Sequence, residues 1–167
     1  MGVRRVVTGH DDAQRSVVIS DEEVPSIAFG ERGGWAWPIW GRDDTAHFPD
    51  GGTAPTWTSA FPPIGGCRLT VFSLTPGGSE DFDNFITQNL AEYAVPDRPG
   101  LHRTPTLDFD IVLAGEVVLE LEDDHEVTLS VGDIVVQNGT RHRWVNRGST
   151  EARIAAVTIG ADHKLSA

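Results

Sequence analysis

The sequence has almost no cysteine, and this scarcity limits its covalent chemistry. Cys67 is the single cysteine among 167 residues, so the chain forms no internal disulfide. A chain without disulfides fits a reducing compartment, and we therefore expect a cytoplasmic protein. Cys67 opens the β-prone run Cys67-Arg68-Leu69-Thr70-Val71, where a small buried hydrophobe is a better interpretation than a reactive nucleophile.

Positive charge is also scarce. Thirteen lysines and arginines stand against twenty-five aspartates and glutamates, which gives a formal net charge of -12. This charge repels phosphate backbones and anionic membrane surfaces. The chain also has no helix-turn-helix pattern and no basic patch. We therefore expect neither nucleic acid nor a membrane among its partners.

Long apolar segments are missing as well. No apolar run approaches the roughly 20 residues that a membrane-spanning helix needs. The N-terminal residues Met1-Gly2-Val3-Arg4-Arg5 lead into a short β-prone run and not into the apolar core of a signal peptide. The sequence therefore predicts no transmembrane segment and no secretory leader.

What the sequence does contain is the composition of one folded domain. Hydrophobic residues make up 39% and charged residues 23%, as in ordinary globular proteins. A chain of 167 residues is long enough to bury a core and too short for two ordinary domains. No internal repeat is present, so we expect a single copy of whatever fold it adopts.

Short β-prone runs, separated by turn residues, dominate the second half of the chain. This spacing is typical of a small antiparallel barrel or sandwich. The runs cover residues 67–74, 102–121, 126–129, 134–136, 142–145 and 153–159. The prediction is an all-β fold with a single antiparallel β-barrel or jelly roll over residues 65–160, followed by a tail at 161–167.

Residues 1–64 are predicted to be an N-terminal extension that packs on the barrel. It holds β-prone runs at 5–8 and 16–19 and four of the five tryptophans, among them Trp35 and Trp37 on one strand face. These rings could line a ligand pocket, although an aromatic core or a dimer interface is the better interpretation. Such an aromatic extension must be buried somewhere, and we therefore expect a homodimer.

The chain has one candidate helix and one long loop. Residues 83–94 repeat apolar side chains near helical spacing, and Pro96 and Pro99 follow them. Residues 41–66 are rich in glycine, proline, aspartate and threonine, which indicates irregular structure. We expect Phe48, Trp57 and Phe61 to anchor this loop over the barrel.

Polar side chains recur at every second position after the predicted helix. They are His102, Thr104, Thr106, Asp108 and Asp110. On an unbroken strand they would share one face, but six residues of strand span about 20 Å, too far for the first and fourth to share an ion. Pro105 lacks the N–H that a strand needs, so the chain can bend there.

The spacing resembles the two motifs of the cupin superfamily. His102 matches the first histidine of G-x5-H-x-H-x3,4-E-x6-G, Asp108 takes the place of the glutamate, and Gly115 closes the motif. Pro96 stands at the opening glycine, and Thr104 stands at the second histidine. The likeness extends over roughly residues 65–160 and is greatest to small bacterial single-domain cupins.

The second motif, G-x5-P-x-G-x2-H-x3-N, is also matched. Gly132, Gly139, His142 and Asn146 occupy its fixed positions. Asn138 stands at the proline, with one residue fewer before the histidine. The resemblance thus implies a cupin barrel whose polar residues gather at the barrel mouth.

The resemblance implies that His102, Asp108 and His142 converge inside the barrel. Two imidazoles and one carboxylate suffice for Fe(II), Mn, Ni or Zn and leave positions for water and substrate. Thr104 would add a weak hydroxyl ligand or hold a bound water. The alternative is a metal-free hydrogen-bond network of the same residues.

Three residues are candidates for the chemistry itself: Asp110, Trp144 and Thr104. Two carboxylates in a low-dielectric cavity raise the pKa of one of them, which prepares a general acid or base near neutral pH, and Asp110 is that candidate beside Asp108. Trp144 would form a stacking wall for a ring or an apolar chain, though a plain core tryptophan is an equal alternative.

These residues predict an enzyme acting on a small oxygenated metabolite in the barrel mouth. Isomerisation, dehydration, decarboxylation and dioxygenation all remain open, because one fold hosts many chemistries. The alternative is a non-catalytic small-molecule-binding protein, which the missing second histidine at Thr104 favours.

Overall fold

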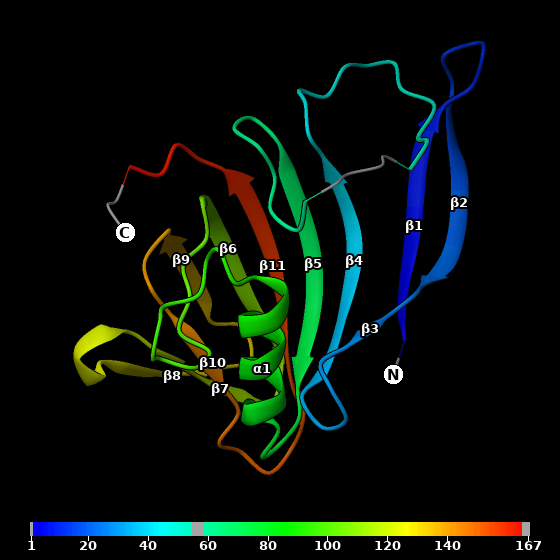
Figure 1. Cartoon of the computed structure of the whole chain (residues 1–167). Helices are drawn as coiled ribbons and strands as arrows, with labels where there is room; N and C mark the ends of the chain where they lie inside the picture. Colours follow the sequence, from blue (N-terminus) through cyan, green and yellow to red (C-terminus); the bar gives the residue numbers. More distant parts are fainter. Residues whose placement is uncertain (1, 55–58, 165–167) are drawn as a thin grey trace.

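The protein is built almost entirely from antiparallel strands with one helix against them (Figure 1). The structure, a computed structural model, describes residues 2–54 and 59–164. The strands are β1 (Val3–His10), β2 (Ser16–Val24), β3 (Ile27–Ala28), β4 (Gly34–Arg42), β5 (Cys67–Leu74), β6 (Thr106–Ala114), β7 (Glu116–Glu120), β8 (Glu126–Ser130), β9 (Ile134–Asn138), β10 (Arg143–Val145) and β11 (Ala152–Gly160). The helices are α1 (Ser79–Asn89) and the short 3-10 turn η1 (Glu122–Asp124).

Two sheets form the barrel region. The larger has six strands in the order β3-β4-β5-β11-β6-β9, and the smaller has three in the order β10-β7-β8. All of the pairings between these strands are antiparallel. This arrangement confirms the predicted all-β jelly roll with one α-helix, because the expected strands occur at the expected places.

The main core lies between the two sheets and under α1. Val117 and Ile154 are fully buried there, together with Phe82 and Ile86 of the helix and Trp144 of β10. Alternate residues of β11 point inward, which is the pattern expected of a strand with one buried face, whereas three consecutive residues of β7, Val117 to Leu119, are all buried. The core therefore ties the helix and both sheets into one unit.

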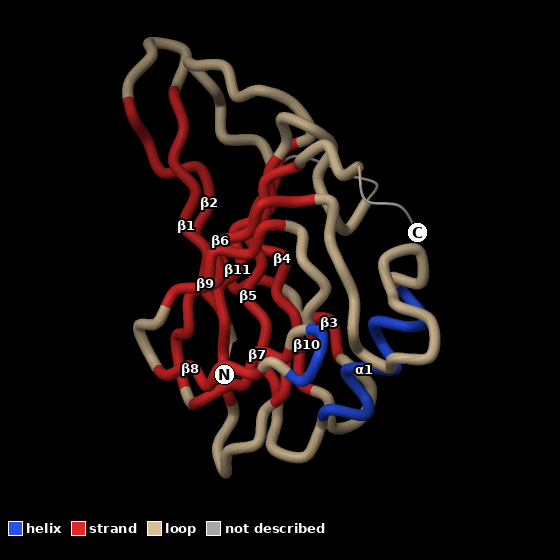
Figure 2. Tube along the Cα trace, turned by 90° about the vertical axis from the view of Figure 1, so that its left-hand side faces the viewer, coloured by secondary structure: helices blue, strands red, loops and turns tan. Residues whose placement is uncertain are grey.

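The first 64 residues divide into two parts. β3 and β4 are strands of the six-stranded sheet, since β4 pairs with β5 from Gly34 to Arg42. β1 and β2 form a separate hairpin beside them, and its turn end projects past the sheets in Figure 2. Trp37 packs with Val24 of that hairpin in a second, smaller core.

The hairpin exposes apolar side chains. Val6 and Val18 are among the large hydrophobic residues at the surface. The homodimer stays a prediction.

Several local predictions need correction. α1 covers Ser79–Asn89 and not residues 83–94, because the chain leaves the helix at Leu90 and continues in turns. Phe48 is 76% exposed and so does not anchor the long loop, whereas Phe61 packs edge-on against Tyr93 at 4.9 Å between ring centroids. Cys67 is exposed rather than buried. Trp57 lies outside the described residues.

An ion pair fastens α1 to the smaller sheet. Asp83 is buried on the helix, and its carboxylate accepts two hydrogen bonds from Arg143 of β10, at 3.0 Å from Nε and 2.5 Å from Nη2. Arg143 also donates to Glu120 of β7 at 2.9 Å. Burial raises the pKa of Asp83, while Arg143 acts in the opposite direction. The pairing fixes the helix over the barrel.

Gly100 is required at the start of the loop that carries His102. Its φ is +78°, and a Cβ there would lie 1.9 Å from Oδ1 of Asp83. Only glycine adopts this conformation without strain and also leaves room for the carboxylate. The loop that carries His102 therefore contacts the Asp83 carboxylate of α1 at Gly100, where a side chain would not fit.

We expect Gly100→Ala to lower the free energy of unfolding by roughly 3 kcal/mol, because it adds backbone strain and displaces the Asp83 carboxylate from Arg143. Gly132→Ala is the matched control: its φ is +93°, but nothing lies within 4 Å of the added Cβ. That control should cost only the strain, about 1 kcal/mol. Urea denaturation of both variants measures the difference, and equal losses would contradict the proposed clash.

Candidate functional site

A cavity of about 390 Å³ opens between the six-stranded sheet, α1 and the loops that lead to β6 and β10. One side is apolar and comes largely from α1, with Phe82, Phe85 and Ile86. The other side is polar and contains His102, Thr104, Asp108, Asp110 and His142, together with Trp144. The structure thus brings all six sequence-predicted site residues to one cavity.

The polar side comes from the inward face of β6. Burial alternates along this strand, so Asp108 and Asp110 share the buried face. In the sheet they lie opposite Thr158 and Ala156 of β11. The strand begins only at Thr106, after a bend at Pro105, and the predicted break in the strand is confirmed. The bend lets the preceding loop return toward the cavity.

Two backbone hydrogen bonds hold the histidines together. The N–H of His102 donates to the carbonyl of His142 at 3.0 Å, and the N–H of His142 donates back at 2.8 Å. The ring centroids are 4.4 Å apart. Residues 40 positions apart in the sequence are therefore paired as in a strand ladder.

Both imidazoles are neutral and have the same tautomer. Nδ1 of His102 lies 2.9 Å from the carbonyl of Gly100, and Nδ1 of His142 lies 3.0 Å from that of Thr140. A carbonyl oxygen only accepts, so each Nδ1 carries the proton and each Nε2 keeps a lone pair. Burial lowers the pKa of His102, and burial with its neighbour lowers the pKa of His142 to about 3.

The two aspartates are buried with few partners. Oδ2 of Asp108 accepts a hydrogen bond from Thr104 at 3.1 Å, while its Oδ1 is buried with no hydrogen-bond partner among the described residues. Burial is the main cause that raises the pKa of Asp108. Burial and the charge of Asp108 raise the pKa of Asp110 to about 7. The predicted pair of interacting carboxylates is therefore present.

The metal ligands meet only in part. Across residues 2–54 and 59–164, no three His, Cys, Asp or Glu side chains lie close enough together to hold one ion. His102 and His142 present two lone pairs, but Asp108 does not complete the set as it lies. The residues present do not fit the three-ligand centre that the resemblance implies, and a bound Fe, Mn, Ni or Zn stays a prediction.

Thr104 occupies the position of the missing imidazole. Its side chain is buried in the cavity wall, and its hydroxyl is engaged with Asp108. The hydroxyl thus positions a carboxylate. Its role as a weak metal ligand or water holder stays a prediction.

Aromatic rings line much of the remaining wall. Trp144 packs against His142 and Phe72, at 6.1 and 6.4 Å between ring centroids. Phe72 in turn stacks with Phe82 of α1 at 6.3 Å. The phenylalanines of this wall were not among the site residues predicted from the sequence. Phe72 lies on the same face of its predicted strand as Arg68 and Thr70, and this alternation could have placed it in the cavity wall.

Arg68 also lines the cavity but is already engaged. It is buried, and its Nη1 donates to the carbonyls of Arg42 and Cys67 at 2.8 and 2.9 Å. Its Nη2 forms an ion pair with Asp43. The guanidinium therefore links two segments at the cavity edge.

Asn146 of the second motif has a structural role. Its Nδ2 donates to the carbonyls of Leu74 and Thr150, and its Oδ1 accepts from the N–H of Gly148. These bonds join the end of β5 to the turn before β11. Asn146 therefore closes one end of the fold and does not line the cavity.

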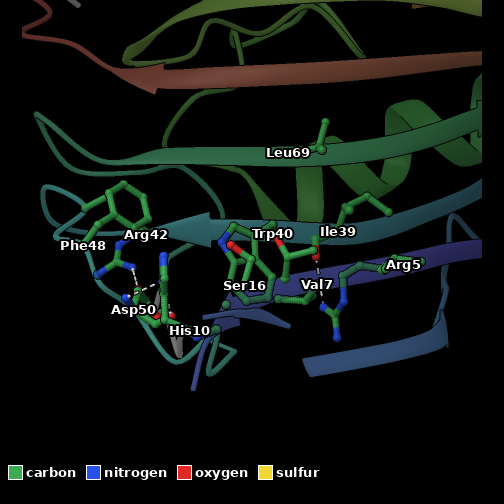
Figure 3. A pocket seen from close by; sticks show the side chains of 15 residues that line it. Arg5, Val7, His10, Ser16, Ile39, Trp40, Arg42, Phe48, Asp50 and Leu69 are labelled. Carbon is green, nitrogen blue, oxygen red and sulfur yellow. Dashed lines mark hydrogen bonds and ion pairs between the residues drawn. The ribbon is translucent and has the colours of Figure 1, made fainter. Parts of the chain in front are cut away.

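A second hollow of about 490 Å³ lies between β1 and β4 (Figure 3). Trp40 lines it, so one of the tryptophans does face a hollow, while Trp37 belongs to a core. At its rim Arg42 pairs with Asp50 at 2.8 Å, and the ring of His10 lies 3.2 Å from the backbone of Asp50. These contacts hold the long loop to the hairpin.

The jelly roll places two histidines and two aspartates at one cavity. Residues 89–159 match the family model described as Cupin domain, which supports placing the chain in the cupin superfamily. This stretch contains β6 to β10, nearly all of β11 and every sequence-predicted site residue.

Curated relatives resemble only part of the chain. A protein called oryzines biosynthesis cluster protein J, from Aspergillus oryzae, is 41% identical over 53% of this chain and 46% of its own length. A cupin-domain-containing oxidoreductase of Aspergillus ruber is 35% identical over 42% of this chain and 36% of its own length. The chain spans less than half the length of these relatives. They are fungal, and the expected bacterial affinity is not supported by them.

Among solved structures, a Cupin 2 conserved barrel domain protein from Salinispora arenicola is similar. It is 18% identical, with a TM-score of 0.41, over 64% of this chain and 71% of its own. No helix among the described residues is both long and apolar enough to cross a membrane.

We expect Asp110→Asn to change the pH dependence of stability. The native pKa of about 7 lies above the unfolded value of 3.8, so this carboxyl favours the folded state below the unfolded value, and the contribution is lost as pH rises to about 7. The melting temperature of the variant relative to wild type should therefore rise across this window and level off above it. Across the whole window, the free energy of unfolding of the variant relative to wild type should increase by about 4 kcal/mol. A pH-independent difference between the two proteins would contradict the raised pKa.

Thr104→His should create the third imidazole beside the existing pair. We expect Ni²⁺ affinity to rise roughly tenfold or more, because three imidazoles satisfy a metal better than two. Thr104→Val is the control, since it removes the hydroxyl without adding a ligand. Titration calorimetry measures the change, and His102→Ala or His142→Ala should reverse it. Unchanged affinity in Thr104→His would show that position 104 does not face the ion.

Proposed function

We propose that this protein is an enzyme that binds a small oxygenated molecule in the 390 Å³ cavity and moves a proton on it. The observation that carries this proposal is the pair Asp108 and Asp110, buried on one strand face and directed into a cavity with an apolar opposite wall. Burying polar groups without partners is costly, and such a cost is typical of binding and catalytic sites.

Asp110 is the proton-transfer group in this proposal. No hydrogen bond from another described residue engages its carboxylate, so both oxygens are available to a ligand. A carboxyl whose pKa is about 7 exists in both forms near neutral pH. It can take a proton from a substrate C–H or O–H as the carboxylate and return it as the acid, which is the chemistry of isomerisation, dehydration and related eliminations.

The other polar residues position the substrate. Nε2 of His102 and of His142 accepts hydrogen bonds from substrate hydroxyl groups, since both rings are neutral. Thr104 orients Asp108 through its hydroxyl. Trp144 and the phenylalanines cover the apolar part of the molecule and exclude water, which strengthens the polar contacts inside.

Oxidation is the second candidate. It is supported by a relative with a matching segment, the Aspergillus ruber protein named as a cupin-domain-containing oxidoreductase. That reaction needs an electron acceptor such as molecular oxygen. Oxygen consumption in the assay below distinguishes this activity from proton transfer.

We expect Asp110→Asn to slow turnover by roughly 10²–10⁴-fold, because the amide keeps the shape of the side chain and cannot transfer the proton. The assay incubates the protein with a mixture of small oxygenated metabolites in D₂O and follows consumption and deuterium incorporation by NMR. Asp12→Asn, which changes an exposed carboxylate, is the control and should remain fully active.

Full activity in Asp110→Asn would overturn the assigned role. Saturable binding of a compound by wild type, with neither consumption nor deuterium incorporation, would instead favour the non-catalytic binding protein.

A further inference from the structure

The polar side of the cavity holds two carboxylates and two imidazole lone pairs, together with the hydroxyl groups of Thr70 and Thr158, which can donate or accept. Asp108 has a buried Oδ1 without a partner, and no hydrogen bond from another described residue engages the carboxylate of Asp110. Nε2 of His102 and Nε2 of His142 each present a lone pair, because their Nδ1 protons are bound to carbonyls. The Thr104 hydroxyl donates its proton in a hydrogen bond to Asp108 and is therefore not a donor to the ligand.

Among the described residues that line the cavity, the one cationic side chain is bound to other groups. Arg68 lines the cavity, but its terminal nitrogens bond to two backbone carbonyls and to Asp43. The formal net charge of the chain is -12, so the surrounding field is also negative. An anionic ligand would therefore be repelled, and a neutral acceptor-only ligand would leave the buried oxygens unpaired.

The opposite wall defines the rest of the ligand. Phe82, Phe85 and Ile86 of α1 face the cavity, and Trp144 stands beside His142. This surface favours an aromatic or branched hydrocarbon body. The faces of aromatic rings also attract a cation that has lost its water shell.

We propose that the ligand of this cavity carries a protonated amine on an apolar body, and that the ammonium group is held by Asp108 and Asp110. An ammonium has several donors and no acceptor, which complements the carboxylates and the imidazole lone pairs. Its charge would offset the repulsion between the two carboxylates. This inference rests on the proposed function of the cavity and names the class of substrate that it takes.

The test compares three probes of similar shape and different charge, after metal ions have been removed with EDTA. They are 2-phenylethylamine, 2-phenylethanol and 3-phenylpropionate, each titrated by calorimetry near neutral pH. We expect the amine to bind at least about tenfold more tightly than the alcohol, as charge-assisted hydrogen bonds allow, and the carboxylate not to bind.

The carboxylates supply the matched variants. Asp108→Asn and Asp110→Asn should each weaken amine binding by about tenfold or more and weaken alcohol binding much less, because the amide keeps an acceptor oxygen but loses the charge. Asp12→Asn lowers the net negative charge equally at an exposed site and should change neither. Melting curves show whether each variant keeps its fold. If one variant has no melting transition, the other Asp→Asn variant supplies the comparison.

Three outcomes would overturn the proposal. The first is equal binding of amine and alcohol, and the second is no amine binding at millimolar concentration. The third is amine binding that appears only after Ni²⁺ or Zn²⁺ is added, since a metal would then occupy the acceptors. Proton transfer by Asp110 fails separately, through unchanged turnover in Asp110→Asn, because these titrations measure binding alone.

Discussion

The site depends on the reciprocal backbone hydrogen bonds between His102 and His142. They join the loop before β6 to the segment before β10, just beyond the β6–β9 ladder, in which Leu107 pairs with Asn138. Because each backbone group is satisfied by the other, the backbone holds the two ring centroids 4.4 Å apart. The tautomers follow from neighbouring carbonyls, so the chemistry of both imidazoles is set by the backbone.

The helix depends on the same loop. Asp83 of α1 and the loop residue Gly100 meet where a Cβ would not fit, and Arg143, which follows His142, binds the Asp83 carboxylate. A change in the Asp83–Arg143 ion pair would therefore also shift the histidine pair, because Gly100 and Arg143 lie within two residues of His102 and His142. This connection explains how a barrel with a separate helix keeps an apolar wall in fixed relation to its polar wall.

The strands were predictable because their signals are local. Alternating residues and turn glycines mark β6 to β11, and Pro105 marks the bend before β6. The gathering of His102 and His142 at one cavity came from the resemblance to cupins and could not be read from spacing, since it depends on pairing across 40 residues. The helix was misplaced because Ser79 to Phe82 carry weak helical periodicity, and the turns after Leu90 keep apolar residues at helical spacing.

Other properties of the site depend on packing between segments that are distant in the sequence. The burial of Arg68, its bond to Asp43 and the orphaned Oδ1 of Asp108 all result from which segments lie above the sheet. The phenylalanine wall arises when α1 places Phe82 against Phe72 of β5. Residue types suggested a polar cluster, but only the packing shows that the cluster faces an apolar surface across a cavity.

The balance of donors and acceptors is the last constraint on what this cavity does. A buried acceptor without a donor costs about 1–3 kcal/mol, and a fold under no functional demand would place an apolar side chain there instead. Asp108 and Asp110 lie on a strand whose next inward residue is Val112, so an apolar residue is well accommodated on this face. The carboxylates therefore weaken the fold at a place where stability alone favours valine. In the proposed complex, the ammonium group of the ligand offsets part of this cost by donating hydrogen bonds to the two carboxylates.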